Sequence, residues 1–338
     1  MVTTTSRPRA VALMFPGQGA QHVRMAAGLY GWEEVFTSVL DRAFALLGPE
    51  GPAIRRDWLA DGPPDLLDDA TRAQPLLYAV DYALGRTVLS WGVRPVALLG
   101  HSVGELAAAT LAGVLDFADG VRLIRDRVAS CRLAPPGGML AVAATPDEVA
   151  AHLGDGVAVA AVNAPRQLLL AGPAAPLAAA ERALRAEGRA CLPVRSRQPF
   201  HSPAMTAAAE SSLEQWRLTR LRPPRRTVYS AYLGDVLTAA HACDPRFWAR
   251  QPVDPVLFGP TLDRLLAAGD VLLVEAGPGR GLTALASRHR AVASGASAVV
   301  AMLPARPGGP DDDRDALRLA ARRIAVEAQL AHEVVLPR

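Results

Sequence analysis

The sequence predicts an α/β fold in which a large α/β domain is interrupted by a small ferredoxin-like domain. Three observations predict it. A buried strand leads into a tight turn and a helix near residue 100, the order β-α-β-β-α-β fills residues 137–199, and strands alternate with helical stretches again after residue 200. The 338 residues leave room for such an insertion. We therefore expect a large domain at 1–136 and 200–338 and a small domain at 137–199.

The first elements are an apolar strand, a glycine-rich loop and a helix. Ala10 to Phe15 is an apolar run of strand length, and the loop Pro16-Gly17-Gln18-Gly19-Ala20-Gln21 follows it directly. From Gln74 to Ser90, apolar residues recur at the three- and four-residue spacing of a helix. The loop thus leaves the end of a buried strand.

A second buried strand leads into a candidate nucleophile. Pro95 to Leu99 is followed by Gly100-His101-Ser102-Val103-Gly104, and Glu105 to Leu111 begins a helix rich in alanine. Strand, tight turn and helix are the context of the G-x-S-x-G elbow, in which glycines permit the strained turn that presents the serine. The large domain is therefore expected to be α/β-hydrolase-like with Ser102 as nucleophile. An ordinary turn in which Ser102 caps the helix remains the alternative.

The small domain is predicted from its alternating elements. Met139 to Ala144 is a strand, and Thr145-Pro146-Asp147-Glu148 opens a helix with a capping box, since threonine stands at the N-cap and glutamate three residues later. The remaining elements are strands at Val157–Val162, Gln167–Ala171 and Ala190–Val194 and a helix at Ala175–Glu187. This order is ferredoxin-like.

The last part of the chain returns to the α/β pattern. Val271 to Glu275 is a buried strand that ends in Ala276-Gly277-Pro278-Gly279, and Ala298 to Leu303 is another strand. Asp313 to Gln329 has the pattern of an amphipathic helix, and Pro307 to Asp313 before it has the composition of a loose linker.

Composition excludes several classes of protein. Half of the residues are hydrophobic and a fifth are charged, which excludes disorder and collagen. The net charge of +3 is too small to indicate a nucleic-acid partner. All 36 basic residues are arginine, and the absence of lysine excludes Schiff-base chemistry, pyridoxal phosphate anchoring and a Walker-type phosphate loop.

Metal, membrane and export signals are absent from the sequence. Cys131, Cys191 and Cys243 are odd in number and widely spaced, so we expect small buried hydrophobic residues and neither disulfides nor a metal site. No secretory signal opens the chain, and its apolar runs are shorter than the ~20 residues of a membrane span. We expect a cytoplasmic monomer with no membrane partner.

A serine nucleophile needs a base, and His201 is the candidate. Of the 7 histidines, five lie in polar or helix-surface stretches: His22, His152, His241, His289 and His332. His101 is adjacent to Ser102 on the same turn and cannot face it. His201 lies where the small domain returns the chain to the large one, a position typical of a cleft. Spacing alone leaves this assignment open.

Four motifs together resemble one enzyme family. They are Phe15-Pro16-Gly17-Gln18-Gly19-Ala20-Gln21, Gly100-His101-Ser102-Val103-Gly104-Glu105, Phe200-His201-Ser202 and Glu275-Ala276-Gly277-Pro278-Gly279. In this order they resemble malonyl-CoA:acyl-carrier-protein transacylases and the acyltransferase domains of polyketide synthases. The resemblance runs from about residue 10 to residue 305. A ferredoxin-like insertion between serine and histidine is also a feature of that family.

The resemblance implies roles for individual residues. Ser102 resembles the acyl-accepting serine and His201 the general base. The backbone carbonyl of Gln251 looks like the group that orients the histidine in place of a triad acid. The amides of Gln18 and Val103 correspond to the oxyanion hole.

Arg127 matches the arginine that pairs with the free carboxylate of a malonyl group. A planar guanidinium can hold a carboxylate through two parallel hydrogen bonds. Without the resemblance, Arg127 would be interpreted like Arg122 and Arg125 on the same helix, as a solvated arginine.

The tetrapeptide Gln198-Pro199-Phe200-His201 bears on the substrate. In the family, His-Ala-Phe-His accompanies malonyl and Tyr-Ala-Ser-His accompanies methylmalonyl. Phe200 matches the malonyl type, because its ring would crowd an α-methyl branch. Gln198 and Pro199 match neither, so an unusual or carrier-bound acyl donor stays open.

The resemblance implies a two-step acyl transfer without a bound cofactor. Ser102 takes a malonyl-type acyl group from acyl-CoA, and the phosphopantetheine thiol of an acyl carrier protein then receives it. Few residues precede the first predicted strand or follow the last predicted helix, so we expect a discrete, trans-acting enzyme of polyketide biosynthesis, and a domain taken from a larger protein stays open.

Other functions of the same fold stay open. One is a transferase for a larger neutral acyl group between carrier proteins, and another is an editing hydrolase of acyl carrier proteins. Arg127 argues against the hydrolase. A catalytically silent docking module would be expected to lack Ser102 or His201, and both are present.

Overall fold

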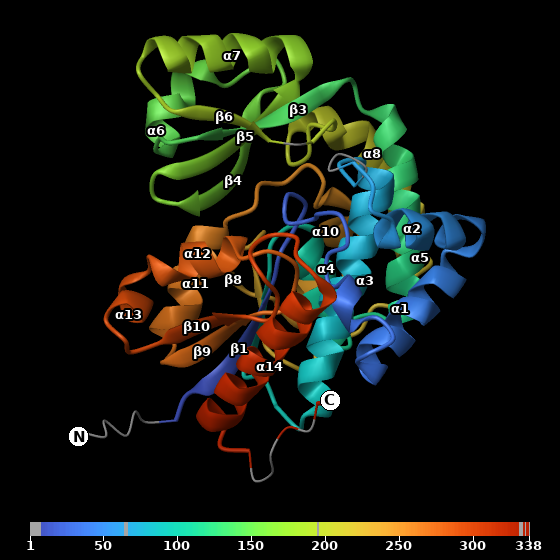
Figure 1. The fold of residues 1–338 in the computed structure, drawn as a ribbon. Helices are drawn as coiled ribbons and strands as arrows, with labels where there is room; N and C mark the ends of the chain where they lie inside the picture. The colour runs from blue at the N-terminus through green and yellow to red at the C-terminus, as the bar shows by residue number, and fades with distance from the viewer. Residues whose placement is uncertain (1–7, 64–66, 195, 331–333, 335, 338) are drawn as a thin grey trace.

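Two β-sheets organise the chain in the computed structural model, which describes residues 8–63, 67–194, 196–330, 334 and 336–337 (Figure 1). The larger sheet has the order β10-β9-β1-β2-β7-β8. Its pairs are parallel except β7 with β8. Its strands are β1 Ala10–Phe15, β2 Ala97–Gly100, β7 Val228–Ser230, β8 Asp235–Val236, β9 Val271–Glu275 and β10 Ala298–Ala301.

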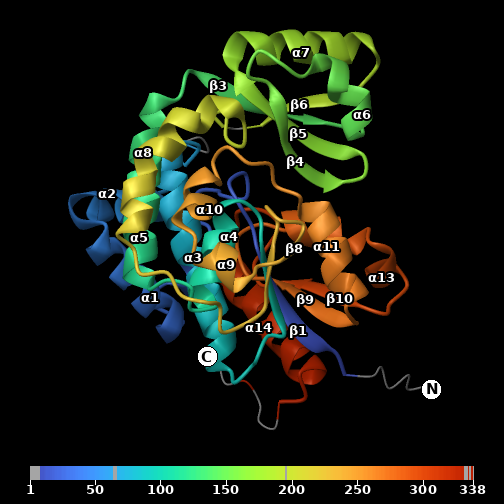
Figure 2. The same ribbon diagram turned by 180° about the vertical axis from the view of Figure 1, so that it is seen from behind.

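The helices cover both faces of the larger sheet and one face of the smaller one (Figures 1 and 2). Their bounds are α1 Glu34–Leu46, α2 Gly51–Leu59, α3 Ala70–Ser90, α4 Val103–Leu111, α5 Phe117–Ser130, α6 Pro146–Val149, α7 Ala174–Ala186, α8 Thr206–Arg217, α9 Ala239–Ala242, α10 Pro245–Arg250, α11 Phe258–Ala267, α12 Gly281–Ser287, α13 Arg290–Ala293 and α14 Pro310–Glu327. None of the helices in the described part of the chain has the length and hydrophobicity needed to cross a membrane.

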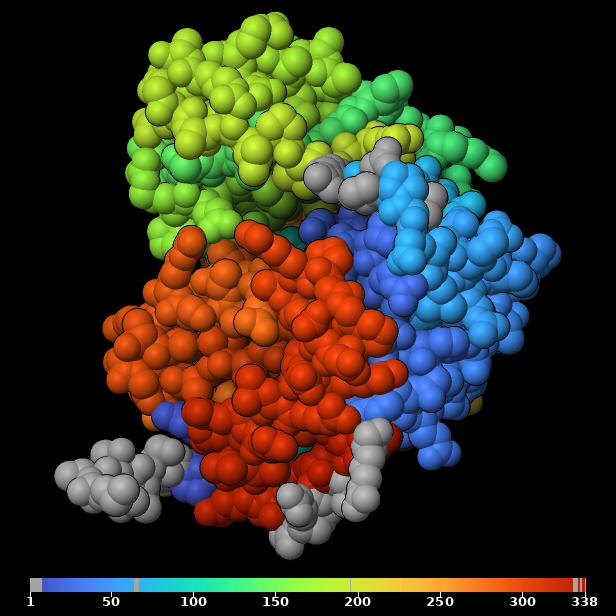
Figure 3. All heavy atoms as spheres, viewed as in Figure 1, coloured from blue at the N-terminus to red at the C-terminus, as the bar shows by residue number. Residues whose placement is uncertain are grey.

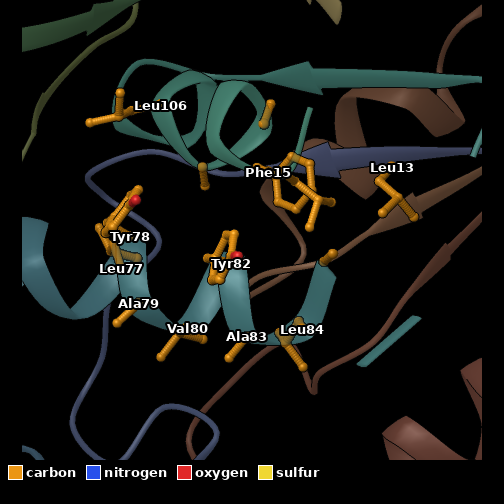
Figure 4. Close-up of a cluster of buried hydrophobic side chains, with 14 of the residues drawn as sticks. Leu13, Phe15, Leu77, Tyr78, Ala79, Val80, Tyr82, Ala83, Leu84 and Leu106 are labelled. Atoms are coloured by element: carbon orange, nitrogen blue, oxygen red, sulfur yellow. The ribbon is translucent and has the colours of Figure 1, made fainter. Parts of the chain in front are cut away.

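β1 shows how the sequence builds the larger sheet. Its side chains alternate between two cores, with Leu13 and Phe15 in one and Ala12 and Met14 in the other. Because both faces are covered, the strand is apolar at every buried position rather than at every second one. Figure 4 shows α3 and Leu106 of α4 packed against the Leu13–Phe15 face. Helices α11 and α12 supply the opposite core.

The smaller sheet is antiparallel, with the order β4-β5-β3-β6. Its strands are β3 Gly137–Val142, β4 Ala158–Ala164, β5 Gln167–Pro173 and β6 Cys191–Val194. With α6 and α7 it encloses a separate core that includes Leu140, Leu170 and Leu184. The predicted α/β fold with a ferredoxin-like part is confirmed. The domain bounds at residues 136 and 200 stay a prediction.

The smaller sheet is joined to the larger body through β4. Ala161 forms a parallel bridge with Val256. The amide of Val162 donates to the Val256 carbonyl at 2.8 Å, and the amide of Val256 donates to the Ala160 carbonyl at 2.9 Å. Figure 2 shows β4 above α11, and Figure 3 shows the small sheet, in green, seated on the orange and blue parts of the body. The bridge fixes how the two sheets lie together.

Several predicted elements differ at their ends. The predicted helix after the serine begins at Val103 rather than at Glu105, so Ser102 is its N-cap. The capping box of Thr145 and Glu148 is confirmed. The linker prediction was wrong in its second half: α14 begins at Pro310, and buried Asp313 accepts a hydrogen bond from the Gly28 amide at 2.9 Å.

Candidate active site

Ser102 lies on a strained turn between β2 and α4. Its φ of 54° and ψ of −119° define a backbone conformation that residues other than glycine rarely adopt. The two glycines of the motif are required by close backbone approaches. A Cβ at Gly100 would collide with the backbone of Glu105, and one at Gly104 with the carbonyl oxygen of Phe15. The predicted strand, turn and helix therefore present Ser102 as an elbow, with the residue 8% exposed.

The loop after β1 passes over this elbow. The amide of His101 donates to the Phe15 carbonyl at 2.9 Å, and a Cβ at Gly17 would lie 3.1 Å from the Cβ of Ser102. Gln18 is the next residue, and its side-chain oxygen accepts a hydrogen bond from Gln74 at 3.0 Å. Val103 is the first residue of α4, so its amide has no acceptor within the helix. The segments that carry the two predicted oxyanion amides thus flank Ser102, and the role itself stays a prediction.

His201 faces the serine. Ser102 Oγ lies 2.7 Å from His201 Nε2, and His201 Nδ1 lies 3.0 Å from the carbonyl oxygen of Asp254. A carbonyl can only accept, so Nδ1 carries the proton and Nε2 is left to accept from the serine hydroxyl. The backbone of His201 has a positive φ of 64°, and its amide donates to the Pro252 carbonyl at 2.6 Å.

Two backbone carbonyls act on the His201 ring, that of Asp254 and the predicted one of Gln251, so the role assigned to Gln251 stays a prediction. The hydrogen bond at 3.0 Å is to the carbonyl of Asp254, and the Gln251 carbonyl acts on the ring more weakly. The cause is the turn after α10, where the amides of Val253 and Asp254 both donate to the Arg250 carbonyl and carry the chain back toward the histidine. The Asp254 carboxylate points elsewhere and pairs with Arg250 at 2.7 Å.

The electrostatic setting keeps His201 neutral. Burial, followed by the positive charge of Arg127, lowers the pKa of His201 to about 3, although the carbonyls of Asp254 and Gln251 act in the opposite direction. A neutral imidazole with a free Nε2 can accept a proton, so His201 is equipped to act as a general base near neutral pH. His101 turns away from Ser102 as predicted, with its Nε2 2.9 Å from Asn163 Oδ1.

Arg127 is a buried cation close to these two residues. It is 7% exposed, and its Nε and Nη2 have no hydrogen-bond partner within the described residues. Its guanidinium lies 5.9 Å from the centre of the Phe200 ring. Arg122 and Arg125 on the same helix are partly exposed and pair with Asp119 and Asp126. A buried charge without an acceptor is costly, so Arg127 has the setting of a group that binds an anion.

Phe200 and Gln198 lie on the chain just before His201. Phe200 is 3% exposed and packs with Val128, Cys131 and Met205 beneath Arg127. Gln198 is half-buried, and its side-chain oxygen has no partner in the described part of the chain. Phe200 therefore forms part of the wall next to the guanidinium, while the predicted selectivity roles of both residues stay predictions.

Two residues of the site were not predicted from the sequence. Tyr232 lies with its ring centre 5.9 Å from that of His201, and Asn163 is the partner of His101. Neither belongs to a motif, and only the folded chain brings them to the serine. Of the predicted surface histidines, His332 lies outside the described residues. Within those residues no three metal-binding side chains are grouped together.

Together these groups can carry out nucleophilic acyl transfer. The Ser102–His201 pair has the arrangement of a nucleophile and its general base. Backbone amides beside the serine, such as that of Val103 at the first position of α4, can stabilise an oxyanion. The buried guanidinium of Arg127, with Nε and Nη2 unpaired among the described residues, has the chemistry to pair with a carboxylate.

Comparisons with known proteins agree with this chemistry. The family model described as acyl transferase domain matches residues 13–325. A phenolphthiocerol/phthiocerol polyketide synthase protein of Mycobacterium tuberculosis is 39% identical over 279 residues, covering 82% of this chain and 19% of that protein. The spectinabilin polyketide synthase system protein NorB of Streptomyces orinoci is 34% identical over 316 residues, covering 91% and 14%. The chain thus spans at most about a fifth of the length of these relatives.

Solved structures share the fold over nearly the whole chain. The acyl transferase domain of SpnD, in complex with 2-(pent-4-yn-1-yl)malonyl, aligns with a TM-score of 0.87 and 32% identity over 97% of this chain and 79% of that one. The acyltransferase domain from the second module of the salinomycin polyketide synthase has a TM-score of 0.85 and 32% identity over 98% and 79%. A malonyl-transacylase in complex with its type II polyketide synthase acyl-carrier protein has a TM-score of 0.81 and 26% identity over 93% and 99%.

Proposed function

The chain belongs to the acyl transferase domain family and is an acyltransferase, and from that premise we propose that it moves a malonyl-type acyl group from coenzyme A to the phosphopantetheine thiol of an acyl carrier protein. The observation that carries the choice of acyl group is Arg127, a buried cation with unpaired donors beside Ser102 and His201 within the described chain. A malonyl group offers the carboxylate that such a cation needs.

In the first half-reaction, Ser102 becomes acylated. His201 Nε2 takes the hydroxyl proton, and Ser102 Oγ attacks the thioester carbon of malonyl-CoA. The oxyanion that forms accepts hydrogen bonds from the amides of Gln18 and Val103. The carbon–sulfur bond then breaks, and the imidazolium of His201 gives its proton to the departing sulfur. The product is a malonyl ester of Ser102.

The second half-reaction runs the same chemistry in reverse with another thiol. The phosphopantetheine thiol gives its proton to His201 Nε2, and its sulfur attacks the ester carbon. Ser102 Oγ leaves and takes the proton back from the imidazolium. The carbonyl of Asp254 holds the ring in one tautomer throughout, because Nδ1 keeps its proton in both steps.

Arg127 also acts on the base. Its charge lowers the pKa of His201 and so disfavours the imidazolium that each step forms, and burial of the ring acts in the same direction. A carboxylate paired with Arg127 would neutralise that charge and make proton uptake by His201 easier. The site would thus activate its base most strongly when a malonyl-type group is bound.

The acyl group is proposed to be small at its α-carbon. Phe200 is buried next to Arg127, so its ring would lie close to an acyl group whose carboxylate meets the guanidinium. An α-methyl branch would meet this ring. Gln198 stands two residues before Phe200 and is proposed to tune the same selectivity, since its buried oxygen has no partner in the described chain.

The partner and the pathway are proposed from the relatives. The curated relatives are polyketide synthase proteins, and one structural neighbour is a malonyl-transacylase in complex with an acyl-carrier protein. We infer that an acyl carrier protein of polyketide synthesis receives the group here. No bound cofactor is needed for the proposed steps. The cytoplasmic location, the monomeric state and the trans-acting arrangement stay predictions.

Intact-protein mass spectrometry tests the proposal. The enzyme is incubated with malonyl-, methylmalonyl- and acetyl-CoA, and then with a phosphopantetheinylated carrier protein. We expect a malonyl adduct that disappears as the carrier protein gains the same mass. His201→Ala should slow adduct formation by roughly 10²-fold or more. Preferential loading of a neutral acyl group, or release to water rather than to the carrier protein, would instead indicate the neutral-acyl transferase or the editing hydrolase.

A further inference from the structure

Tyr232 is held at the active site by a buried hydrogen-bond network. The Glu105 carboxyl group accepts hydrogen bonds from Ser230 Oγ at 2.6 Å and from the Ala231 amide at 2.8 Å. The Ala231 carbonyl in turn accepts from the Leu257 amide at 2.6 Å. These bonds fix the segment after β7 against α4. Because Tyr232 follows directly, its backbone position is determined by the elbow helix itself.

The Tyr232 ring has two aromatic neighbours, His201 and Phe247. Its centre is 5.9 Å from the His201 ring and 6.4 Å from the Phe247 ring, which it meets edge-on. Two neighbouring rings restrict the tilt of the phenol.

The Tyr232 hydroxyl is a hydrogen-bond donor. It is buried and has no hydrogen-bond partner in the part of the chain that the structure describes. Burial raises the pKa of Tyr232, while the charge of Arg127 and the neighbouring Ser102 hydroxyl act in the opposite direction. The phenol thus keeps its proton at neutral pH. Geometry places Tyr232 and Arg127 around the same histidine. The His201 ring, which contacts Ser102 Oγ, lies 5.9 Å from the Tyr232 ring and 6.4 Å from the Phe200 ring. The Arg127 guanidinium lies 5.9 Å from the centre of the Phe200 ring.

Tyr232 and Arg127 both have buried hydrogen-bond donors near the Ser102–His201 pair. The Nε and Nη2 of Arg127 are also buried and without partners among the described residues. The nearby carboxyl groups are already engaged, because Glu105 accepts from Ser230 and the Asp254 carboxylate pairs with Arg250. Two buried donors that lack an acceptor in the described chain are available to an acceptor from a ligand.

A malonyl ester on Ser102 has two groups that can accept. Its ester carbonyl is the oxygen for which the proposed mechanism uses the amides of Gln18 and Val103. Its free carboxylate has about four lone-pair sites, so it can accept from a guanidinium and still accept from another donor. We propose that Tyr232 is a substrate-binding residue whose phenol donates a hydrogen bond to this carboxylate alongside Arg127. This inference rests on the proposed function.

The proposal gives the site two donors for one anion. A neutral acyl group such as acetyl would leave both the phenol and the guanidinium buried and unpaired. Each unpaired group would lower the affinity of the site for acetyl relative to malonyl. Tyr232 would then contribute to selectivity through its hydroxyl group rather than through the volume of its ring.

Tyr232→Phe tests this directly, because it removes the hydroxyl and keeps the ring. The rates of Ser102 acylation from malonyl-CoA and from acetyl-CoA are measured by intact mass. We expect the malonyl rate to fall by about tenfold or more, as for the loss of a hydrogen bond to a charged group, with little change for acetyl. Tyr229→Phe, a buried tyrosine of β7, is the matched control and should leave the ratio unchanged.

The outcomes separate this inference from the proposed function. If the acylation rates from malonyl-CoA and from acetyl-CoA fall equally in Tyr232→Phe, the phenol acts on Ser102 or on the oxyanion. If neither rate changes, Tyr232 is a packing residue. Either result overturns the inference. Wild-type enzyme that forms no malonyl adduct would overturn the proposed function instead. In the double variant Tyr232→Phe with Arg127→Ala, the loss of malonyl acylation rate should be smaller than the two single losses combined. The reason is that both side chains would donate to the same carboxylate. Full additivity would contradict a shared ligand.

Discussion

Ser102 Oγ and His201 Nε2 lie 2.7 Å apart although the residues are separated by 99 positions in the chain. Both residues have a positive φ, 54° and 64°. Such conformations are strained outside glycine, and a fold keeps them only when the surrounding contacts hold them in place. The contacts around these two residues therefore hold the backbones of the nucleophile and its base in place.

Replacing Ser102 with alanine should abolish acyl-enzyme formation. The covalent ester needs the hydroxyl oxygen that faces His201, and the turn offers no other. The measurement is the intact mass of the variant after incubation with malonyl-CoA, with thermal unfolding as the control for the fold. A malonyl adduct that persists on Ser102→Ala would move the nucleophile to another residue.

Acylation should stay fast well below neutral pH. His201 has a pKa lowered from 6.5 to about 3, so the base remains unprotonated as the pH falls toward about 5, where an ordinary histidine would be inactive. The pH profile of acylation from malonyl-CoA checks this. In Arg127→Ala the acid limb should move to higher pH, because the charge that disfavours the imidazolium is gone. A wild-type acid limb near pH 6.5 would show that burial does not shift this histidine.

Arg127→Ala should lose malonyl transfer and gain acetyl transfer relative to it. The change removes the cation that would pair with the malonyl carboxylate. It also removes the unpaired buried charge that a bound acetyl group would face. Hydrogen bonds to charged groups contribute ~1.5–3 kcal/mol, so malonyl selectivity should fall at least about tenfold. Arg127→Lys should restore it only partly, since an ammonium lacks the two-pronged geometry. Competition between the two CoA esters measures the ratio, and an unchanged ratio would rule out the carboxylate role.

Gly104→Ala should destabilise the protein by ~1–3 kcal/mol or more, because the added methyl group meets the backbone carbonyl of Phe15. Gly281→Ala is the matched control. It stands at the start of α12 with no atom within 4 Å of the new Cβ, so it should change stability by only a few tenths of a kcal/mol or stabilise slightly. Urea unfolding of both variants tests this. Equal stability would mean that the loop can move away from the elbow.

Local patterns predicted the parts of the site that lie within one stretch of chain. The elbow around Ser102 could be predicted from its glycines and flanking elements, because the strain and the close approaches involve neighbours in sequence. The small sheet was predicted from strand and helix periods alone. The exposed thiol of Cys243 was not, since exposure depends on how distant segments pack.

The remaining parts depend on tertiary packing. Arg122, Arg125 and Arg127 look alike in sequence, and only the packing of α5 buries the last of them. The hydrogen bond between His201 and the Asp254 carbonyl depends on the shape of the turn after α10, which no motif in the sequence indicates. Tyr232 carries no motif, and it becomes recognisable only once Glu105 has fixed its segment beside Ser102.

The bridge between Ala161 and Val256 limits how this enzyme can be recombined with its relatives. The segment that pairs with β4 continues directly from Asp254, whose carbonyl holds the histidine. A chimera that exchanges only residues 137–199 would inherit β4 from one parent and its pairing partner from the other. The natural unit of exchange therefore includes residues 251–258, so grafts that carry this segment should retain transfer activity more often than grafts cut at the sheet boundary.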